Sequence, residues 1–206
     1  MNLIECVHSR YVYRRRVKVL ADHLTALLPD KATLLDVGCG DGLLTRMIVD
    51  RRRDTDAQGI DVLLRQNAHM KITQFNGEVI PHPPKSFDVV MFVDVLHHTE
   101  NPLTLLREAI RVARRRILIK DHTLKGFLAY PILCFMDRIG NVRHRVHLPY
   151  NYWTEFKWRD TFQNLGLKVV HWNSELNLYP PPVNWLFDRS LHFIAELELN
   201  VNMCKT

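Results

Sequence analysis

The sequence predicts an α/β protein in which a mostly parallel sheet is covered by helices on both faces. Three observations support this fold class. Apolar strand-like runs alternate with helical patterns, the run Phe87–Asp94 is almost continuously apolar, and a glycine-rich turn at residues 38–42 joins a strand to a helix. A continuous apolar run is typical of a strand covered on both faces, and alternating strands and helices favour a parallel sheet.

The first predicted element is a helix over Tyr11–Leu28, which carries apolar residues at helical spacing and ends at Pro29. Next, in chain order, we expect a strand, a helix, a strand, a short helix and a strand. The strands cover Thr33–Val37, Ala57–Val62 and Lys71–Phe75. The helices cover Leu43–Arg52 and the stretch between residues 62 and 71.

The second half of the chain starts with the buried strand Phe87–Asp94. A helix over Pro102–Ala113 follows, with a proline in its first turn, and then the strand Arg116–Lys120. In the last third we expect a helix over Glu155–Leu165 and a strand over Lys168–Trp172. A proline-rich loop and a final strand over His192–Leu197 follow. We interpret the last two strands as a hairpin added at one edge of the sheet.

Length and composition fit one compact domain, with 206 residues of which 47% are apolar and 24% charged. The 28 Lys and Arg residues exceed the 22 Asp and Glu residues by six. This excess permits an acidic partner or peripheral contact with a membrane surface, and requires neither. Four widely spaced cysteines favour a reduced, cytoplasmic chain. The longest apolar run, Gly126–Met136, is too short to span a membrane.

The strongest motif is the turn after the first strand, Asp36-Val-Gly38-Cys-Gly40-Asp-Gly42. Glycine permits a positive φ and lets a ligand touch the backbone, and the amides that open the next helix favour polar or anionic groups. Nineteen residues after Gly42, Asp61 ends the second strand, where a carboxylate can accept both hydroxyls of a ribose. Two further elements follow the third and fourth strands, Asn76-Gly77 and Asp94-Val95-Leu96-His97-His98.

In these motifs and in their order, the sequence resembles the class I S-adenosylmethionine-dependent methyltransferases of the small-molecule type. The resemblance covers residues 30–122 strongly and the C-terminal third more loosely. It implies a doubly wound, Rossmann-like sheet of seven strands, mostly parallel with a C-terminal antiparallel hairpin. It also implies S-adenosylmethionine as the cofactor and S-adenosylhomocysteine as the product.

The resemblance places the cofactor contacts at the ends of the first four strands. Asp36 is expected to order the glycine turn and the methionine end of the cofactor, and Asp61 to hold the ribose hydroxyls. Val93 and Asp94 are expected beside the methionine ammonium. Many members have an aspartate at the adenine position, where this chain has Asn76. The full set of expected contacts is Asp36, Gly38, Cys39, Gly40, Asp61, Val62, Asn76, Gly77, Val93 and Asp94.

We expect a single methyltransferase domain over residues 1–206, in four parts. Residues 1–29 contain the N-terminal helix and residues 30–122 form the cofactor-binding core. Residues 123–153 are expected to form a lid or acceptor region, because this long connection follows the fifth strand. Residues 154–206 contain the C-terminal helix and hairpin.

A nicotinamide-dependent dehydrogenase is the alternative with a similar glycine turn. Its fingerprint is GxGxxG, whereas Gly42 comes one residue early in this chain. Asp36 also adds negative charge, which disfavours a pyrophosphate but suits a sulfonium and an ammonium. The glycine turn therefore favours the methyltransferase.

Methyl transfer requires alignment and the exclusion of water, and a general base only when the acceptor is a hydroxyl or a similar weak acid. The predicted base is His122, after the fifth strand, with Asp121 either orienting it or capping the next segment. A neutral structural histidine is the alternative for His122. We do not assign catalysis to the His97-His98 pair. His144 and His147 lack the further ligands that a metal needs, so we expect no metal.

The expected lid carries the aromatic residues Phe127, Tyr130, Phe135, Tyr150, Tyr152 and Trp153. Such side chains line pockets for apolar or ring-shaped molecules, although each one could equally belong to the core. We therefore expect O- or C-methylation of a small, apolar or aromatic acceptor. Nucleic acid is disfavoured because the fourth strand lacks the polar-Pro-Pro-aromatic motif of base methyltransferases. A catalytically silent binding or regulatory domain, and an RNA or protein methyltransferase, stay open. The sequence indicates no oligomeric state.

Overall fold

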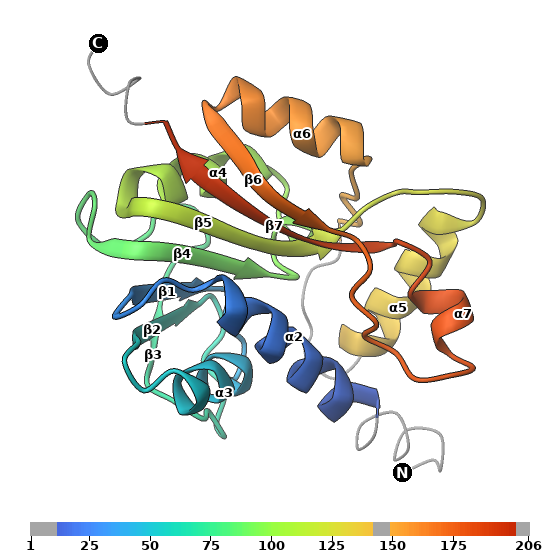
Figure 1. The fold of residues 1–206 in the computed structure, drawn as a ribbon, viewed down its shortest axis with the longest axis horizontal. Helices are drawn as coiled ribbons and strands as arrows, with labels where there is room; N and C mark the ends of the chain where they lie inside the picture. The colour runs from blue at the N-terminus through green and yellow to red at the C-terminus, as the bar shows by residue number, and fades with distance from the viewer. Residues whose placement is uncertain (1–11, 142–148, 201–206) are drawn as a thin grey trace.

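The computed structural model describes residues 12–141 and 149–200, which form a seven-stranded sheet with helices on both faces (Figure 1). The strands are β1 (Thr33–Val37), β2 (Asp56–Asp61), β3 (Ile72–Gln74), β4 (Phe87–Val93), β5 (Ala113–His122), β6 (Leu167–Asn173) and β7 (His192–Leu199). The helices are α2 (Tyr13–Leu27), α3 (Leu43–Arg51), the 3-10 helix η2 (Leu96–His98), α4 (Pro102–Val112), α5 (Ala129–Asn141), α6 (Glu155–Asn164) and α7 (Asn184–Phe187).

The order of strands across the sheet is β3-β2-β1-β4-β5-β7-β6. The first five strands in the sequence pair parallel to one another. β7 runs antiparallel to both of its neighbours, β5 and β6. The predicted fold class, a mostly parallel sheet with a C-terminal antiparallel hairpin, is confirmed. The hairpin joins the sheet through β7, so β6 forms the edge.

Alternation along β4 explains why its sequence is apolar throughout. Val90 and Phe92 belong to the core that α4 and α6 cover, whereas Val89 and Met91 belong to the core that α2 and α3 cover. All four side chains are fully buried, because successive residues of a strand point to opposite faces. This is the two-sided burial that the sequence predicts for this strand.

Local signals in the sequence start the helices that cover the sheet. Asn101 caps α4 by accepting a hydrogen bond from the Leu103 amide at 3.2 Å, and Pro102 opens the helix. Thr154 caps α6 by accepting from the Lys157 amide at 3.2 Å. Both helices begin where the sequence predicts.

The prediction of a short helix between residues 62 and 71 is wrong, because this stretch consists of turns. It has no apolar stripe to bury, since Leu63 and Leu64 are both exposed. Its backbone is held by the glycine turn instead, where the His69 amide donates to the Asp41 carbonyl at 2.7 Å. The tertiary contacts of this stretch therefore replace helical hydrogen bonds.

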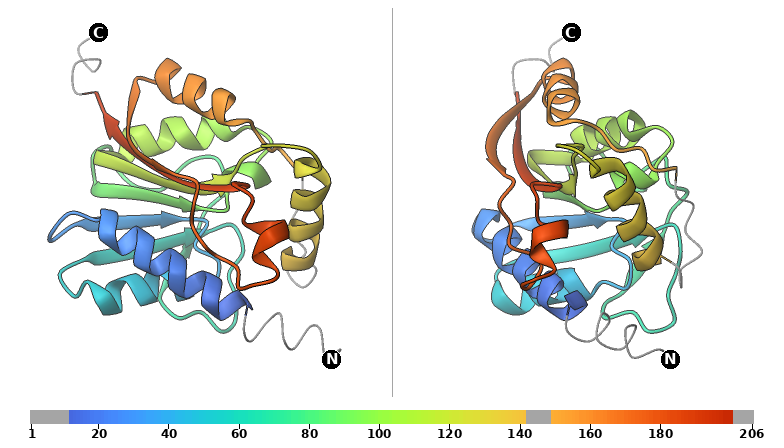
Figure 2. Two further views of the ribbon diagram at one scale, coloured as in Figure 1. Left: turned by 45° about the vertical axis from the view of Figure 1, so that its right-hand side comes forward. Right: turned by 90° about the vertical axis from the view of Figure 1, so that its right-hand side faces the viewer.

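The direction of the strands brings several segments to one end of the molecule. β1, β2, β4 and β5 end there, β7 starts there, and α5 and α7 lie side by side beyond it (Figures 1 and 2). Ligands of open α/β sheets bind outside the carboxyl ends of the strands. In the described part of the chain, no helix has both the length and the hydropathy needed to cross a membrane.

Candidate functional site

The three glycines of the turn after β1 all have positive φ, at 76° for Gly38, 64° for Gly40 and 75° for Gly42. A Cβ on Gly38 would lie 2.5 Å from Val95 Cγ2, and one on Gly42 would lie 2.5 Å from Met70 Cγ. These two positions therefore need glycine for packing. At Gly40 the nearest atom would be 3.6 Å away, on Arg65. Gly40 thus leaves an open backbone surface that a ligand can approach.

Asp61 ends β2 beside this open surface. Its carboxylate accepts hydrogen bonds from the Gly40 amide and from the Leu63 amide, both at 2.8 Å. An ionised carboxylate has about four acceptor positions, so two hydroxyl groups can still be accommodated. The predicted ribose-binding residue and the predicted glycine turn are brought together.

Asp36 and Cys39, at the turn after β1, both have raised pKa values. Asp36 is buried and accepts a hydrogen bond from the Thr45 hydroxyl of α3, which ties β1 to the helix. Burial raises the pKa of Asp36 to about 7, although the Thr45 bond opposes the shift. Burial also raises the pKa of the Cys39 thiol, and the charges of Asp36 and Asp61 raise it further. The thiol therefore stays protonated at neutral pH.

The expected adenine position is formed by residues after β2 and β3. A Cβ on Gly77 would lie 3.2 Å from Val62 Cγ1, so these two residues face each other. Asn76 Oδ1 already accepts from the Glu78 and Val79 amides, at 3.0 and 2.9 Å. Because an amide oxygen has two lone pairs, an adenine amino group would have to displace one of these bonds.

Asp94, directly after Val93 at the end of β4, lies between two cations. Its carboxylate forms ion pairs with Arg16 of α2 and Lys120 of β5. Burial alone would raise the pKa of Asp94, but these charges outweigh burial and hold the pKa well below its ordinary value. The contact of Val93 and Asp94 with an ammonium stays a prediction.

Sequence reasoning missed both cations around Asp94. Lys120 is completely buried, and it directly follows the apolar run 117–119 of a central strand, which is a signal that could have identified it. Arg16 comes from the N-terminal helix, where it is one of three consecutive arginines. Nothing in its sequence neighbourhood distinguishes it from the other two.

Asp121 is paired with His97 in the structure. It accepts a hydrogen bond from His97 Nδ1 at 2.6 Å and from the Leu96 amide at 3.1 Å. It also accepts from the backbone amide of His122 at 2.7 Å. Asp121 therefore orients the imidazole of His97, whereas the sequence suggested that it could orient the imidazole of His122.

His97 lies between two carboxylates, because its Nε2 is 3.2 Å from Asp137 Oδ2 on α5. Burial lowers the pKa of His97, but the charges and hydrogen bonds of Asp121 and Asp137 outweigh burial and raise the pKa to about 10. His97 is therefore an imidazolium at neutral pH. A protonated imidazole cannot accept a proton from a substrate, so His97 is a structural cation.

His122 has the opposite protonation state and is neutral at neutral pH. It is buried, and burial together with the charges of Lys120 and His97 lowers its pKa. Its Nε2 lies 3.5 Å from Asp94 Oδ1 and 3.6 Å from Asp137 Oδ1. A proton on Nε2 suits these two carboxylates and leaves the lone pair on Nδ1, which has no hydrogen-bond partner among the described residues. Nδ1 is thus the atom that can take up a proton.

Asp137 connects α5 to this histidine cluster, and sequence reasoning missed it. Besides the two histidines, it accepts a hydrogen bond from the Tyr152 hydroxyl. Burial would raise the pKa of Asp137, but the hydrogen bonds of His122 and His97 hold it far below its ordinary value. A signal was present in the sequence, since Asp137 is the one carboxylate in the otherwise apolar segment 126–137.

His97, His98 and Asp137 have the spacing of a metal site. One possible ligand atom from each, a ring nitrogen or a carboxylate oxygen, lies within 4.8 Å of the other two. The two carboxylates beside His97 account for its position as an imidazolium, which donates from Nδ1 to Asp121 and forms an ion pair with Asp137 through Nε2. Burial lowers the pKa of His98 to about 4, and the charge of His97 lowers it further. His144 and His147 lie outside the described residues.

Five of the six aromatic residues of segment 123–153 fall into two groups, and the sixth, Tyr150, is partly buried. Tyr152 and Trp153 are buried, and Trp153 packs on Trp158 of α6 with ring centroids 4.6 Å apart. Phe127, Tyr130 and Phe135 are at least half exposed. The first group is part of the core, which is the alternative to a pocket lining that the sequence left open for each of these residues. The second group does not line the histidine cluster.

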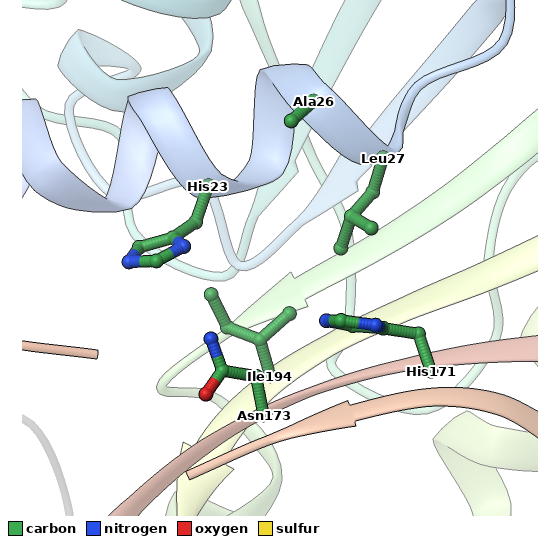
Figure 3. A pocket seen from close by; sticks show the side chains of 6 residues that line it. All are labelled: His23, Ala26, Leu27, His171, Asn173 and Ile194. Carbon is green, nitrogen blue, oxygen red and sulfur yellow. The ribbon is translucent and has the colours of Figure 1, made fainter. Parts of the chain in front are cut away.

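A cavity of about 180 Å³ lies between α2, β6 and β7 (Figure 3). Its lining residues are His23, Ala26, Leu27, His171, Asn173 and Ile194. None of them belongs to the glycine turn or to the histidine cluster. Ligand pockets usually have volumes of about 300–1,000 Å³, so we assign no function to this cavity.

A family model described as a methyltransferase domain matches residues 8–172 of the chain. Among curated proteins, the 27-O-demethylrifamycin SV methyltransferase of Amycolatopsis mediterranei is 32% identical. That match covers 46% of this chain and 40% of the Amycolatopsis enzyme. The chain therefore aligns with less than half of that relative's length.

Solved structures of similar fold include a SAM-dependent methyltransferase from Aquifex aeolicus, at 18% identity and a TM-score of 0.57, over 90% of this chain and 89% of the other. The mitomycin 7-O-methyltransferase MmcR has 17% identity and a TM-score of 0.62, over 89% of this chain and 54% of the other. The 4+2 cyclase SpnF has 15% identity and a TM-score of 0.63, over 91% and 81%. A fold that also serves a cyclase does not define the chemistry.

Proposed function

Since the chain belongs to the methyltransferase domain family, we propose that it is an enzyme that uses S-adenosylmethionine to methylate a small organic acceptor at an oxygen or an acidic carbon. The observation that carries this proposal is the neutral, buried His122 at the end of β5, with two carboxylates beside Nε2 and an Nδ1 to which no described residue forms a hydrogen bond. Such a group is useful when the acceptor must lose a proton.

The chain's own residues fit the cofactor. Gly40 offers an open backbone surface, and Asp61 beside it keeps free acceptor positions for two ribose hydroxyls. Val62 and Gly77 offer a small apolar wall for a flat ring. Asp61 adds a negative charge at the turn that suits a cation, whereas Asp36, with its pKa raised to about 7, is only partly ionised at neutral pH. When bound there, S-adenosylmethionine supplies an electrophilic methyl group on a sulfonium.

The role proposed for His122 is that of a general base. Nδ1 takes up the acceptor proton, and the imidazolium that forms is stabilised by Asp94 and Asp137, which lie 3.5 and 3.6 Å from Nε2. Asp121 then acts only through His97, which it holds beside Asp137. We therefore retain His122 as the proposed catalytic residue and describe Asp121 as a positioning residue.

The acceptor proposed is a small organic molecule, because the cluster around His122 is enclosed by α5 and by buried aromatic residues. Nucleic acid is not part of the proposal. A reducing compartment fits the free thiols of Cys39 and Cys134, so we keep the cytoplasm as the proposed location.

Calorimetric titration with S-adenosylmethionine tests the proposal. Asp61→Ala should weaken binding by at least about 10- to 150-fold, because each charge-assisted hydrogen bond that is lost is worth about 1.5–3 kcal/mol. Asp56→Ala is the matched control, because Asp56 is an exposed aspartate at the opposite end of β2, and it should bind as the wild type does. No binding by the wild-type chain, or equal affinity in both variants, would refute the proposal.

A further inference from the structure

The outward side of α5, the turn before it, and α7 expose large apolar side chains. Phe127 is 82% exposed and Trp185 is 78% exposed, values expected of lysine rather than of an aromatic residue. We call these residues the apolar face; its main members are Phe127, Leu128, Tyr130, Phe135, Ile139 and Trp185.

The two helices that carry most of these residues lie together at one end of the molecule (Figure 2). Phe135 of α5 stacks on Phe187 of α7, with ring centroids 6.4 Å apart, so the two helices are in contact. The right-hand view of Figure 2 shows both helices turned toward the viewer, at the end of the molecule where β4 and β5 finish. Contiguous exposed apolar surface of this kind marks an interaction site more often than scattered residues do.

The apolar face is not needed to pack α5 on the rest of the fold. Ala129, Ile132, Leu133 and Asp137 lie on the opposite side of α5 and are buried. The helix therefore has its complete buried stripe without the exposed residues. Its outward apolar side chains remain largely exposed even where they touch a neighbour, as Phe135 touches Phe187 and Tyr130 touches Tyr152, so burying them elsewhere would be favourable.

The charges around the apolar face have one sign. Lys125, Arg138 and Arg189 are exposed there. The carboxylates in segments 124–141 and 180–191 are Asp137, which faces the histidines, and Asp188, which accepts from the Leu178 and Tyr179 amides at 3.1 and 3.0 Å. The described part of this surface thus combines aromatic residues with cations, which is the composition of a surface that lies on anionic lipid.

We propose that the apolar face docks on the surface of an anionic lipid bilayer, with its aromatic side chains inserted at the interface. A second copy of the chain is a poorer occupant. In a two-fold dimer the same patch meets itself, and that arrangement would bring the cations of both copies together. Phosphate headgroups instead complement them.

Docking would place a membrane directly outside the candidate site. Asp137, on the buried side of α5, contacts both His97 and His122. The acceptor class rests on the proposed methyl transfer. The acceptor is then a lipid-soluble hydroxyl compound or carbon acid that reaches His122 from the bilayer. The docking itself is independent of the methyl transfer.

Fluorescence of the full chain mixed with lipid vesicles tests the docking. Trp153 and Trp158 are buried and Trp172 is half-buried, so Trp185, which is 78% exposed, is the tryptophan whose emission should shift most to the blue on insertion. We expect the shift, and co-sedimentation, with vesicles of phosphatidylglycerol and phosphatidylcholine at low salt. Pure phosphatidylcholine should bind at least about tenfold more weakly, because each cation near an anionic surface contributes about fivefold in affinity.

Variants identify the surface. Phe127→Ser combined with Ile139→Ser should reduce vesicle binding at least about tenfold through lost apolar burial. Phe156→Ser is the matched control, since Phe156 is 80% exposed on α6, outside the apolar face, and it should bind vesicles as the wild type does. All variants should keep the wild-type affinity for S-adenosylmethionine, which separates failure of this inference from failure of the proposed function.

Several results would overturn the docking proposal. These are no binding to anionic vesicles, equal binding to both vesicle types, or undiminished binding by the Phe127 and Ile139 double variant. Sedimentation equilibrium supplies another: a wild-type dimer that this double variant dissociates would assign the apolar face to a second copy of the chain.

Discussion

His97 and His122 have ring centroids only 4.5 Å apart, yet they carry opposite protonation states at neutral pH. His97 has a close carboxylate on each side, at 2.6 and 3.2 Å. For His122, burial and the charges of Lys120 and His97 outweigh the more distant carboxylates of Asp94 and Asp137, at 3.5 and 3.6 Å, and lower its pKa. Neighbouring groups with pKa values moved apart are the arrangement that divides structural from acid–base roles. The residue-scale predictions follow from this difference.

Replacing His122 should affect turnover and leave cofactor affinity unchanged. His122→Gln keeps a polar side chain but cannot take up a proton, so we expect the rate to fall by about 10²- to 10⁴-fold. Release of S-adenosylhomocysteine, with a panel of phenols and alcohols as acceptors, measures the rate. His171→Gln, on the exposed side of β6, should react as the wild type does. Full turnover by His122→Gln would make His122 a structural histidine.

The pH dependence of stability should identify His97 as a cation. Its pKa is raised from 6.5 to about 10, so its contribution to the free energy of unfolding is fully present below pH 6.5, falls above that, and is lost above pH 10. Urea unfolding of wild type and His97→Gln should therefore differ most in acid, and the two curves should converge as the pH rises to 10. A difference that grows with pH would contradict this assignment.

At the scale of elements, the connection from β1 to α3 combines packing and binding in one turn. Gly38 is closed against Val95, which follows β4, whereas Gly40 is open. The sequence pattern predicts glycine at both positions but does not separate these two reasons. The neighbouring strand, which comes 50 residues later, creates the difference.

Alanine substitutions should separate the two roles of the turn. Gly40→Ala should cost about 1–2 kcal/mol of stability for its positive φ and should bind S-adenosylmethionine more weakly, because its methyl group enters the open surface. Gly38→Ala adds a clash with Val95 and should lose about 1–3 kcal/mol more. Urea unfolding and calorimetry measure the two effects. Equal stability of the two variants would contradict the packing role of Gly38.

The helix α5 is a second element with two distinct sides. One side buries Leu133 and presents Asp137 to the histidines, and the other side carries the apolar face. Its sequence is apolar nearly throughout, and the sequence predicts a lid or acceptor region here without assigning a helix to it. Tertiary structure leaves one of these sides exposed, which no local pattern records.

At the scale of the whole molecule, the sequence predicts the sheet well. Continuous apolar runs locate β4 and β5, and the alternating order of strands and helices predicts the parallel pairing. The sequence also predicts the glycine turn and Asp61. The turn is recognised from glycines that are close in sequence, and Asp61 from its position at the end of the neighbouring strand. The sequence places the C-terminal hairpin at one edge of the sheet, but the position of β7 between β5 and β6 was not predicted.

The buried charge network was not predictable from the sequence, because its members come from distant segments. Arg16 and Asp94 are 78 residues apart, and His97 and Asp121 are 24 residues apart. With His97 protonated, the cations Arg16, Lys120 and His97 balance the anions Asp94, Asp121 and Asp137. Buried charges are tolerated when paired, and pairing across the fold is visible only once the chain is folded.

The most direct test of the account is a crystal structure of the chain with S-adenosylhomocysteine. We predict that the nucleoside lies over Gly40, with both ribose hydroxyls within hydrogen-bond distance of the Asp61 carboxylate. A nucleoside bound elsewhere, for example in the cavity between α2 and β6, or a glycine turn that stays empty at saturating ligand, would contradict the central claim.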